Sequence, residues 1–171
     1  MIKIYYLRIT KYNPDNRDKN GFYSKDEWSS IGDVGKRFGG KEFTLDEYLC
    51  YEERYLGAII DIMRENNVES LRVESLEKSN YVNHSDFYEP ATKEYFESIK
   101  ENMLIPKQKI PQVAKFVLRE MIWCKLVSDK MFLHFGYDYY MYIGSKQLAD
   151  ETLQSIVSNS LFVESMVSPY L

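Results

Sequence analysis

The spacing of apolar residues along the chain switches several times between a period of two and a helical period. Alternating or continuous apolar runs predict strands, which lie at 1–10, 70–76, 120–127, 131–143 and 161–166. Helical spacing predicts helices at 44–66, 92–103, 111–118 and 148–158. Because strands and helices are mixed without regular alternation, we predict an α+β fold. It would be a single domain over 1–171, with a mainly antiparallel central sheet and helices packed against it.

The helix over 44–66 has the clearest boundaries. Thr44 and Glu47 have the spacing of a capping box, in which each side chain bonds the backbone N–H of the other residue. Asn66 and Asn67 follow the last apolar positions, and asparagine tolerates the left-handed conformation that often ends a helix. We therefore expect a long amphipathic helix with one buried face.

Two polar segments separate the first predicted strand from this helix. Residues 11–21 carry Asn-Pro and Asn-Gly signals, which predict an exposed loop. Residues 22–43 contain four glycines and permit only a short helical turn near 30–35. We predict partner contacts at four residues of this second segment: Asp26, Glu27, Trp28 and Asp33.

The segment 131–143 is rich in tyrosine and is predicted as one long strand, kinked near Gly136 and paired in a hairpin with 120–127. Alternation would turn Tyr137 and Tyr139 toward the core and leave a stripe of two tyrosines and a carboxylate on the other face. Such a stripe suits a partner that carries Arg or Lys, and a covering helix is the equally open alternative. The predicted partner contacts in this segment are Tyr137, Asp138, Tyr140 and Tyr142.

Composition supports a packed binding domain. Hydrophobic residues make up 44% of the chain and charged residues 28%, so a core is expected and global disorder is not. Tyrosine, of which there are 15, suits both strands and interfaces. The formal net charge of −4 gives no support to direct nucleic-acid binding and is compatible with a basic protein partner.

Targeting and cysteine signals are sparse. The first ten residues lack the basic region and apolar run of a signal peptide, and no run of 18 apolar residues occurs. We therefore expect a cytoplasmic protein without a membrane span. Cys50 and Cys124 are predicted to be free buried thiols, and no metal-ligand spacing or cofactor motif is present. The sequence thus predicts no metal and no cofactor.

The chain contains no familiar catalytic motif, and we predict that it is not an enzyme. The carboxylate pairs Asp26–Glu27 and Glu52–Glu53 are interpreted as solvated surface charge. One enzymatic alternative stays open: a small hydrolase in which Cys124 and His134 meet across the hairpin. A regulatory domain that binds a small molecule is a third hypothesis, for which an apolar pocket between helix 44–66 and the sheet would be needed.

Five blocks of the sequence resemble immunity proteins of contact-dependent growth inhibition and related polymorphic toxin systems. They are EWSSIGDVG at 27–35, TLDEYLCYE at 44–52 with Tyr55, LRVESLE at 71–77, LREMIWCK at 118–125 and HFGYDYYMYI at 134–143. The resemblance implies a cytosolic bacterial protein that binds the carboxy-terminal domain of a cognate toxin, often a nuclease, and blocks its active site or substrate access. It also implies that the toxin can add a strand to an exposed sheet edge, for which strand 1–10 or the 131–143 hairpin is the expected donor.

Overall fold

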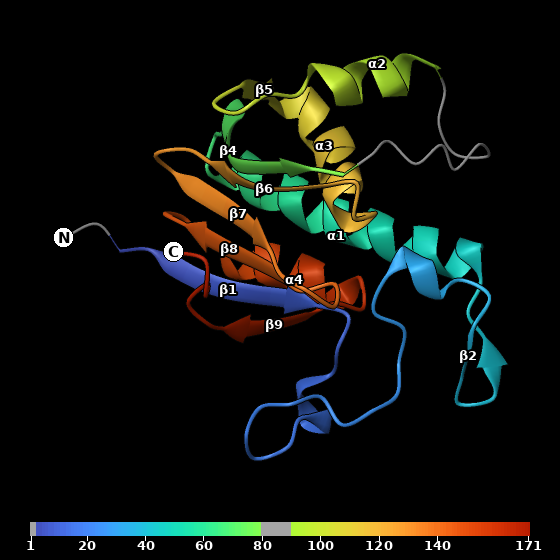
Figure 1. The fold of residues 1–171 in the computed structure, drawn as a ribbon. Helices are drawn as coiled ribbons and strands as arrows, with labels where there is room; N and C mark the ends of the chain where they lie inside the picture. The colour runs from blue at the N-terminus through green and yellow to red at the C-terminus, as the bar shows by residue number, and fades with distance from the viewer. Residues whose placement is uncertain (1–2, 80–89) are drawn as a thin grey trace.

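The computed structural model describes residues 3–79 and 90–171, and it confirms an α+β fold (Figure 1). Seven strands form one antiparallel sheet in the order β5-β4-β6-β7-β8-β1-β9. Their bounds are β1 Tyr5–Thr10, β4 Ser70–Lys78, β5 Leu104–Pro106, β6 Ile122–Val127, β7 Met131–Phe135, β8 Met141–Ser145 and β9 Phe162–Ser165. The helices are α1 Leu45–Glu65, α2 Pro90–Ser98, α3 Ile110–Leu118 and α4 Asp150–Ser158.

Helix α1 begins and ends where the sequence predicts. The Thr44 hydroxyl accepts the Glu47 N–H at 3.2 Å, which satisfies one of the free donors of the first turn. Glu47 itself pairs with Lys41 at 3.4 Å. At the other end the Asn66 side chain is buried and donates to the carbonyl of Ile62 at 2.9 Å. Asn67 then adopts a left-handed conformation with φ 49°, which ends the helix.

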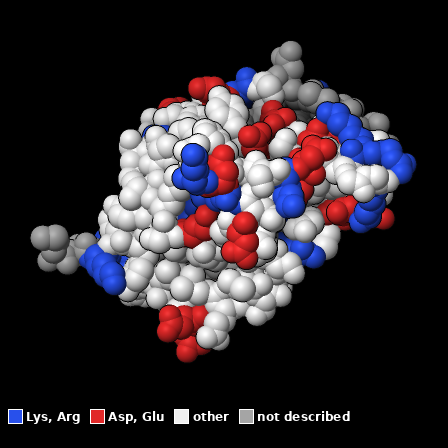
Figure 2. Space-filling view, turned by 90° about the horizontal axis from the view of Figure 1, so that it is seen from below, with Lys and Arg blue, Asp and Glu red and all other residues white. Residues whose placement is uncertain are grey.

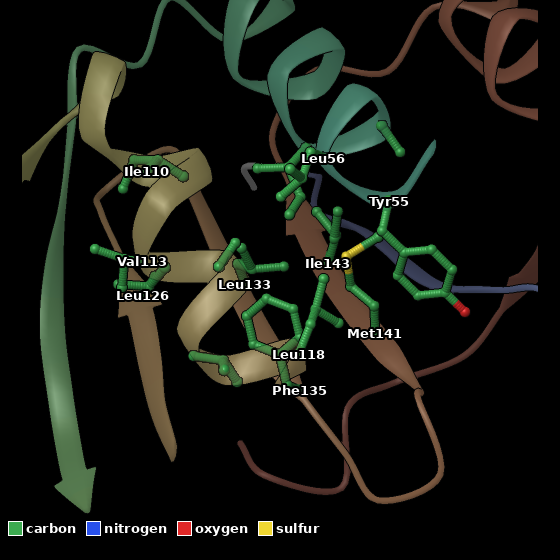
Figure 3. Close-up of a cluster of buried hydrophobic side chains, with 14 of the residues drawn as sticks. Tyr55, Leu56, Ile110, Val113, Leu118, Leu126, Leu133, Phe135, Met141 and Ile143 are labelled. Carbon is green, nitrogen blue, oxygen red and sulfur yellow. The ribbon is translucent and has the colours of Figure 1, made fainter. Parts of the chain in front are cut away.

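The hydrophobic core lies between one face of the sheet and helices α1, α3 and α4, which are behind the strands in Figure 1. Helix α3 is short but buried on most sides, because it sits between α1 and the strands. Figure 3 shows how side chains of the two helices point toward those of the sheet: Tyr55, Leu56, Ile110, Val113 and Leu118 meet Leu126, Leu133, Phe135, Met141 and Ile143.

A buried ion pair joins α1 to the end of α3. Glu52 is fully buried, and its carboxylate accepts hydrogen bonds from Arg119 Nε at 2.7 Å and from Arg119 Nη2 at 2.5 Å. The interpretation of Glu52 as solvated charge is therefore wrong. Its neighbour Glu53 is exposed and pairs with Lys115 at 3.0 Å, as a surface residue does.

The opposite face of the sheet is covered in part by residues 166–171, which follow β9 and include a turn at 169–170. The Ser168 hydroxyl lies 2.8 Å from Nδ1 of His134, and the Tyr170 ring packs against those of Trp123 and Tyr142. The Lys125 ammonium donates to the Tyr170 carbonyl. This segment buries side chains of the outer face that would otherwise be exposed, including His134 and Tyr142.

Several predicted boundaries differ from the structure. Segment 131–143 is two strands, β7 and β8, joined by a turn at 136–140 rather than one kinked strand. The helix predicted at 92–103 starts at Pro90 and ends at Ser98, and strand β5 follows it. The glycine-containing segment forms a small hairpin, β2 Arg37–Phe38 with β3 Lys41–Glu42, after a 3-10 turn at Ile31–Asp33. The polar run at 77–90, which contains His84 and from which the sequence predicts a loop, lies for the most part outside the described residues.

The expected edge strands lie inside the sheet. Strand β1 pairs with β8 and β9, and β7 lies between β6 and β8, so neither is an edge strand of the sheet. The free edges belong to β5 and β9, which have three and four residues. The expectation that strand 1–10 or the 131–143 hairpin supplies an edge for strand addition is therefore wrong.

No helix in the part of the chain that the structure describes is both long and apolar enough to cross a membrane.

Candidate binding site at the β7–β8 turn

The turn between β7 and β8 holds an exposed tyrosine on a strained backbone. Gly136 N–H donates to the Tyr140 carbonyl at 2.8 Å, which closes the turn. Asp138 and Tyr139 both have positive φ angles, 57° and 65°, a combination typical of a type I′ turn and unfavourable for a bulky residue. Tyr137, which lies in this turn, is 87% exposed. Strained backbone of this kind persists only when the surrounding structure holds it in place.

Two tyrosine hydroxyls hold this backbone. Tyr55 of α1 donates to the Tyr139 carbonyl at 2.9 Å and accepts the Lys11 N–H at 2.9 Å. Tyr12, just after β1, donates to the Asp138 carbonyl at 2.7 Å. The Tyr139 ring packs against Trp28 and Tyr55 with ring centroids 5.1 and 4.7 Å apart. The turn is thereby anchored to the core while Tyr137 and the Asp138 carboxylate point outward.

The two predicted contact segments lie next to each other. The Tyr12 hydroxyl is 2.7 Å from the Asp138 carbonyl and 3.4 Å from that of Trp28, so it joins the turn to the segment around residue 28. Ser29 lines the same cavity as Tyr137 and Asp138. Segments more than 100 residues apart in the sequence therefore form one surface.

The structure separates the eight predicted contact residues into exposed and internal ones. Trp28 is buried and stacks on Phe43, and Tyr142 is buried beneath Tyr170. Asp33 completes a capping box with Ser30 and pairs with Lys36 at 2.7 Å. Tyr140 is half-buried and accepts a hydrogen bond from Arg17 at 2.9 Å. The residues that remain available to a partner are Asp26, Glu27, Tyr137 and Asp138.

Glu27 is held by internal partners although it is partly exposed. Its carboxylate accepts a hydrogen bond from the Tyr23 hydroxyl at 2.6 Å and pairs with the Lys11 ammonium at 3.3 Å. That ammonium is buried between the rings of Tyr12 and Trp28, 3.9 and 4.2 Å from their centroids. Burial lowers the pKa of Lys11 to about 8 even though Glu27 opposes the shift.

A cavity of about 550 Å³ opens beside the turn. Its walls are the turn itself, the start of β6 with the residues before it, the end of β4, and Tyr170. Two further carboxylates, Glu77 and Glu120, line this cavity and are not among the contact residues that the sequence predicts. Glu77 directly follows one predicted strand, and Glu120 begins another. Because neighbouring antiparallel strands bring such ends together, these positions are the one local feature of the sequence that could have placed both residues near each other.

The charged side chains on the face seen in Figure 2 are dispersed. Figure 2 views the molecule from below and shows Asp and Glu side chains interspersed with Lys and Arg, separated by wide areas of other residues. The net charge of −4 therefore produces no continuous acidic face in this view. Recognition of a basic partner would depend on individual carboxylates near the turn.

The Cys124 and His134 side chains are on opposite faces of the sheet. Cys124 is fully buried on the core side, and burial raises the pKa of its thiol to about 12. His134 faces the other side, where Ser168 bonds its ring. The pair therefore does not form a nucleophile and base. Cys50, predicted as buried, is exposed on α1, and Cys124 is buried and free as expected.

The apolar pocket that the small-molecule hypothesis needs between α1 and the sheet is not found among the described residues. The space between α1 and the sheet is filled by core side chains, and the cavity lies elsewhere (Figure 3). Among residues 3–79 and 90–171, no group of His, Cys, Asp and Glu is arranged to hold a metal ion.

Comparison with protein-family models, curated proteins and solved structures finds no match to this chain.

The Tyr55 hydroxyl gives a direct test of how the turn is held. Tyr55→Phe is expected to lower the free energy of unfolding by about 2 kcal/mol, because it leaves the Tyr139 carbonyl and the Lys11 N–H buried without this partner. Tyr51→Phe, on the same helix and half-buried, is the matched control and should change stability by less than about 0.5 kcal/mol. Urea denaturation measures both values, and equal effects would contradict the anchoring role.

Proposed function

We propose that this protein binds and neutralises a cognate bacterial toxin domain in the cytoplasm, and that the toxin domain is a nuclease. The observation that carries the proposal is the surface formed by the turn 136–140 and the segment 26–29. It presents an exposed tyrosine, Tyr137, next to the exposed Asp138, and the segment adds the exposed carboxylate of Asp26. Exposed aromatic anchors supply much of the binding energy at protein interfaces, and carboxylates steer a basic partner toward them.

The rigidity of this surface also supports the proposal. The turn is anchored by Tyr12 and Tyr55, so Tyr137 loses little backbone freedom when a partner binds it. Binding there would cover the toxin's active site or the path of its substrate. No residue of this chain takes part in a chemical step in this proposal.

Co-purification with the toxin domain encoded immediately upstream tests the proposal, together with the survival of cells that express that domain. We expect a stable complex and full protection from the unaltered chain. Tyr137→Ala should weaken the complex at least about tenfold without changing the free energy of unfolding, because the removed ring is exposed.

Val157→Ala is the control for this experiment. Val157 is exposed on α4, on the helix side of the sheet, and its truncation should leave both binding and protection unchanged. A chain that neither binds the toxin domain nor protects cells would contradict the proposal. Equal losses from Tyr137→Ala and Val157→Ala would place the binding surface elsewhere.

A further inference from the structure

The cavity beside the turn lies where the sheet splits. Strands β6 and β7 are paired only at Leu126–Leu133 and Val127–Phe132. Beyond these pairs the strands diverge, and the indole N–H of Trp123 spans the gap to the Phe135 carbonyl at 2.9 Å. The cavity of about 550 Å³ occupies this end of the sheet, and its size is within the range of about 300–1,000 Å³ that is typical of ligand pockets.

The charged side chains at the cavity are mainly acidic. Glu77, Glu120 and Asp138 are exposed and come from three different parts of the chain. Within the described part of the chain, no salt bridge involves any of the three. The cavity's single lysine, Lys78, donates to the carbonyls of Phe96 and Glu97 at 2.7 and 3.2 Å. Among the described residues, these three carboxylates thus have no salt-bridge partner.

The walls of the cavity are aromatic. Trp123 and Tyr170 pack edge to face at 5.7 Å, and Tyr137 of the turn also lines the cavity. Aromatic faces attract cations, and a guanidinium stacks on them while its fork of N–H donors bonds carboxylates. An ammonium has no planar face to stack in this way. The combination of rings and carboxylates therefore fits arginine better than lysine.

We propose that this cavity receives an arginine side chain of the protein partner. The guanidinium would stack on the aromatic wall and pair with Glu120 and Asp138, while Tyr137 covers the chain from outside. The inference rests on the proposed function only in taking the partner to be a protein toxin domain. The chemistry of the cavity itself depends on this chain alone.

An NMR titration of the full ¹⁵N-labelled chain tests the cavity without the toxin. The probe is the peptide acetyl-Gly-Arg-Gly-amide, and the control is the same peptide with citrulline, which keeps the shape of arginine but has no charge. We expect saturable shifts of the Trp123 indole N–H and the Gly136 amide with the arginine peptide. Citrulline should bind about tenfold more weakly or not at all.

Variants of the cavity separate specific binding from general attraction. The double variant Glu120→Gln with Asp138→Asn should weaken arginine binding about tenfold while its spectrum remains that of a folded protein. Asp150→Asn, an exposed carboxylate at the start of α4, should leave it unchanged. Equal responses to arginine and citrulline, or shifts that never saturate, would overturn the inference.

The two proposals fail in different ways. A chain that binds arginine in the cavity and does not neutralise the toxin would retain this inference and lose the proposed function. A chain that neutralises the toxin and shows no arginine-dependent shifts would lose the inference alone.

Discussion

Arg119→Met is expected to lower the free energy of unfolding by about 3–5 kcal/mol. Methionine keeps much of the apolar volume of the arginine stem but removes the guanidinium. The Glu52 carboxylate, which is fully buried and accepts two hydrogen bonds from Arg119, would then be left inside the protein without that cation. Leaving one buried charge unpaired destabilises the protein far more than the intact ion pair stabilises it.

Two further variants separate the effect of the buried ion pair from that of its surroundings. Glu53 follows Glu52 on α1 and forms an exposed pair with Lys115. Glu53→Gln breaks this pair and should lower the free energy of unfolding by less than about 1 kcal/mol. The double variant Glu52→Leu with Arg119→Met removes both charges and should be more stable than Arg119→Met alone. Urea denaturation at neutral pH gives all three values. A double variant that is no more stable than Arg119→Met alone would contradict the account.

Acidification from pH 6.5 to 4.5 is expected to remove about 2–3 kcal/mol of stability through His134 alone. Burial lowers the pKa of His134 to about 4, with Lys125 acting in the same direction and Glu74 opposing it. In the unfolded chain the ring has its ordinary pKa of 6.5. The contribution is therefore fully present above pH 6.5 and is lost as the pH falls toward 4, because only the unfolded chain binds the proton in that range.

The matched variant for this prediction is His134→Asn. The asparagine amide has both an acceptor oxygen and donor N–H groups, so it can replace Nδ1 as the hydrogen-bond partner of the Ser168 hydroxyl, and it does not titrate. Stability measured by urea denaturation between pH 7.5 and 4.5 should fall less steeply for this variant than for the unaltered chain. Carboxylates titrate alike in the two proteins, so the difference between their slopes reports His134. Identical slopes for the two proteins would contradict the assignment to His134.

The candidate site could be predicted in part. Sequence patterns selected the segments 26–33 and 134–143, and the structure places them side by side. Within them the patterns could not tell exposed residues from internal ones. Trp28 is predicted as a partner contact and is buried, whereas Tyr137, another predicted contact that strand alternation would turn toward the core, is 87% exposed. Alternation predicts faces only while the strand continues, and here it stops at Phe135.

The burial of Glu52 has the same origin. It lies on the apolar face of α1 between Tyr48 and Tyr55, so the helical period alone places it inward. The presence of a charge there was explained only by Arg119, which is 67 residues away in the sequence. Helical periodicity thus identified the buried face, and the partner that makes a buried carboxylate tolerable came from the packing of α3.

The sequence by itself determined the α+β class, the extent of α1 and most of the strands, because capping and apolar spacing act between residues within a few positions of one another. Only the tertiary structure decided the strand order, the left-handed turn at Asp138 and Tyr139, and the split between β6 and β7. The turn depends on hydroxyl groups 84 and 126 residues away, those of Tyr55 and Tyr12. Contacts over such separations form only when the core packs, and no local pattern records them.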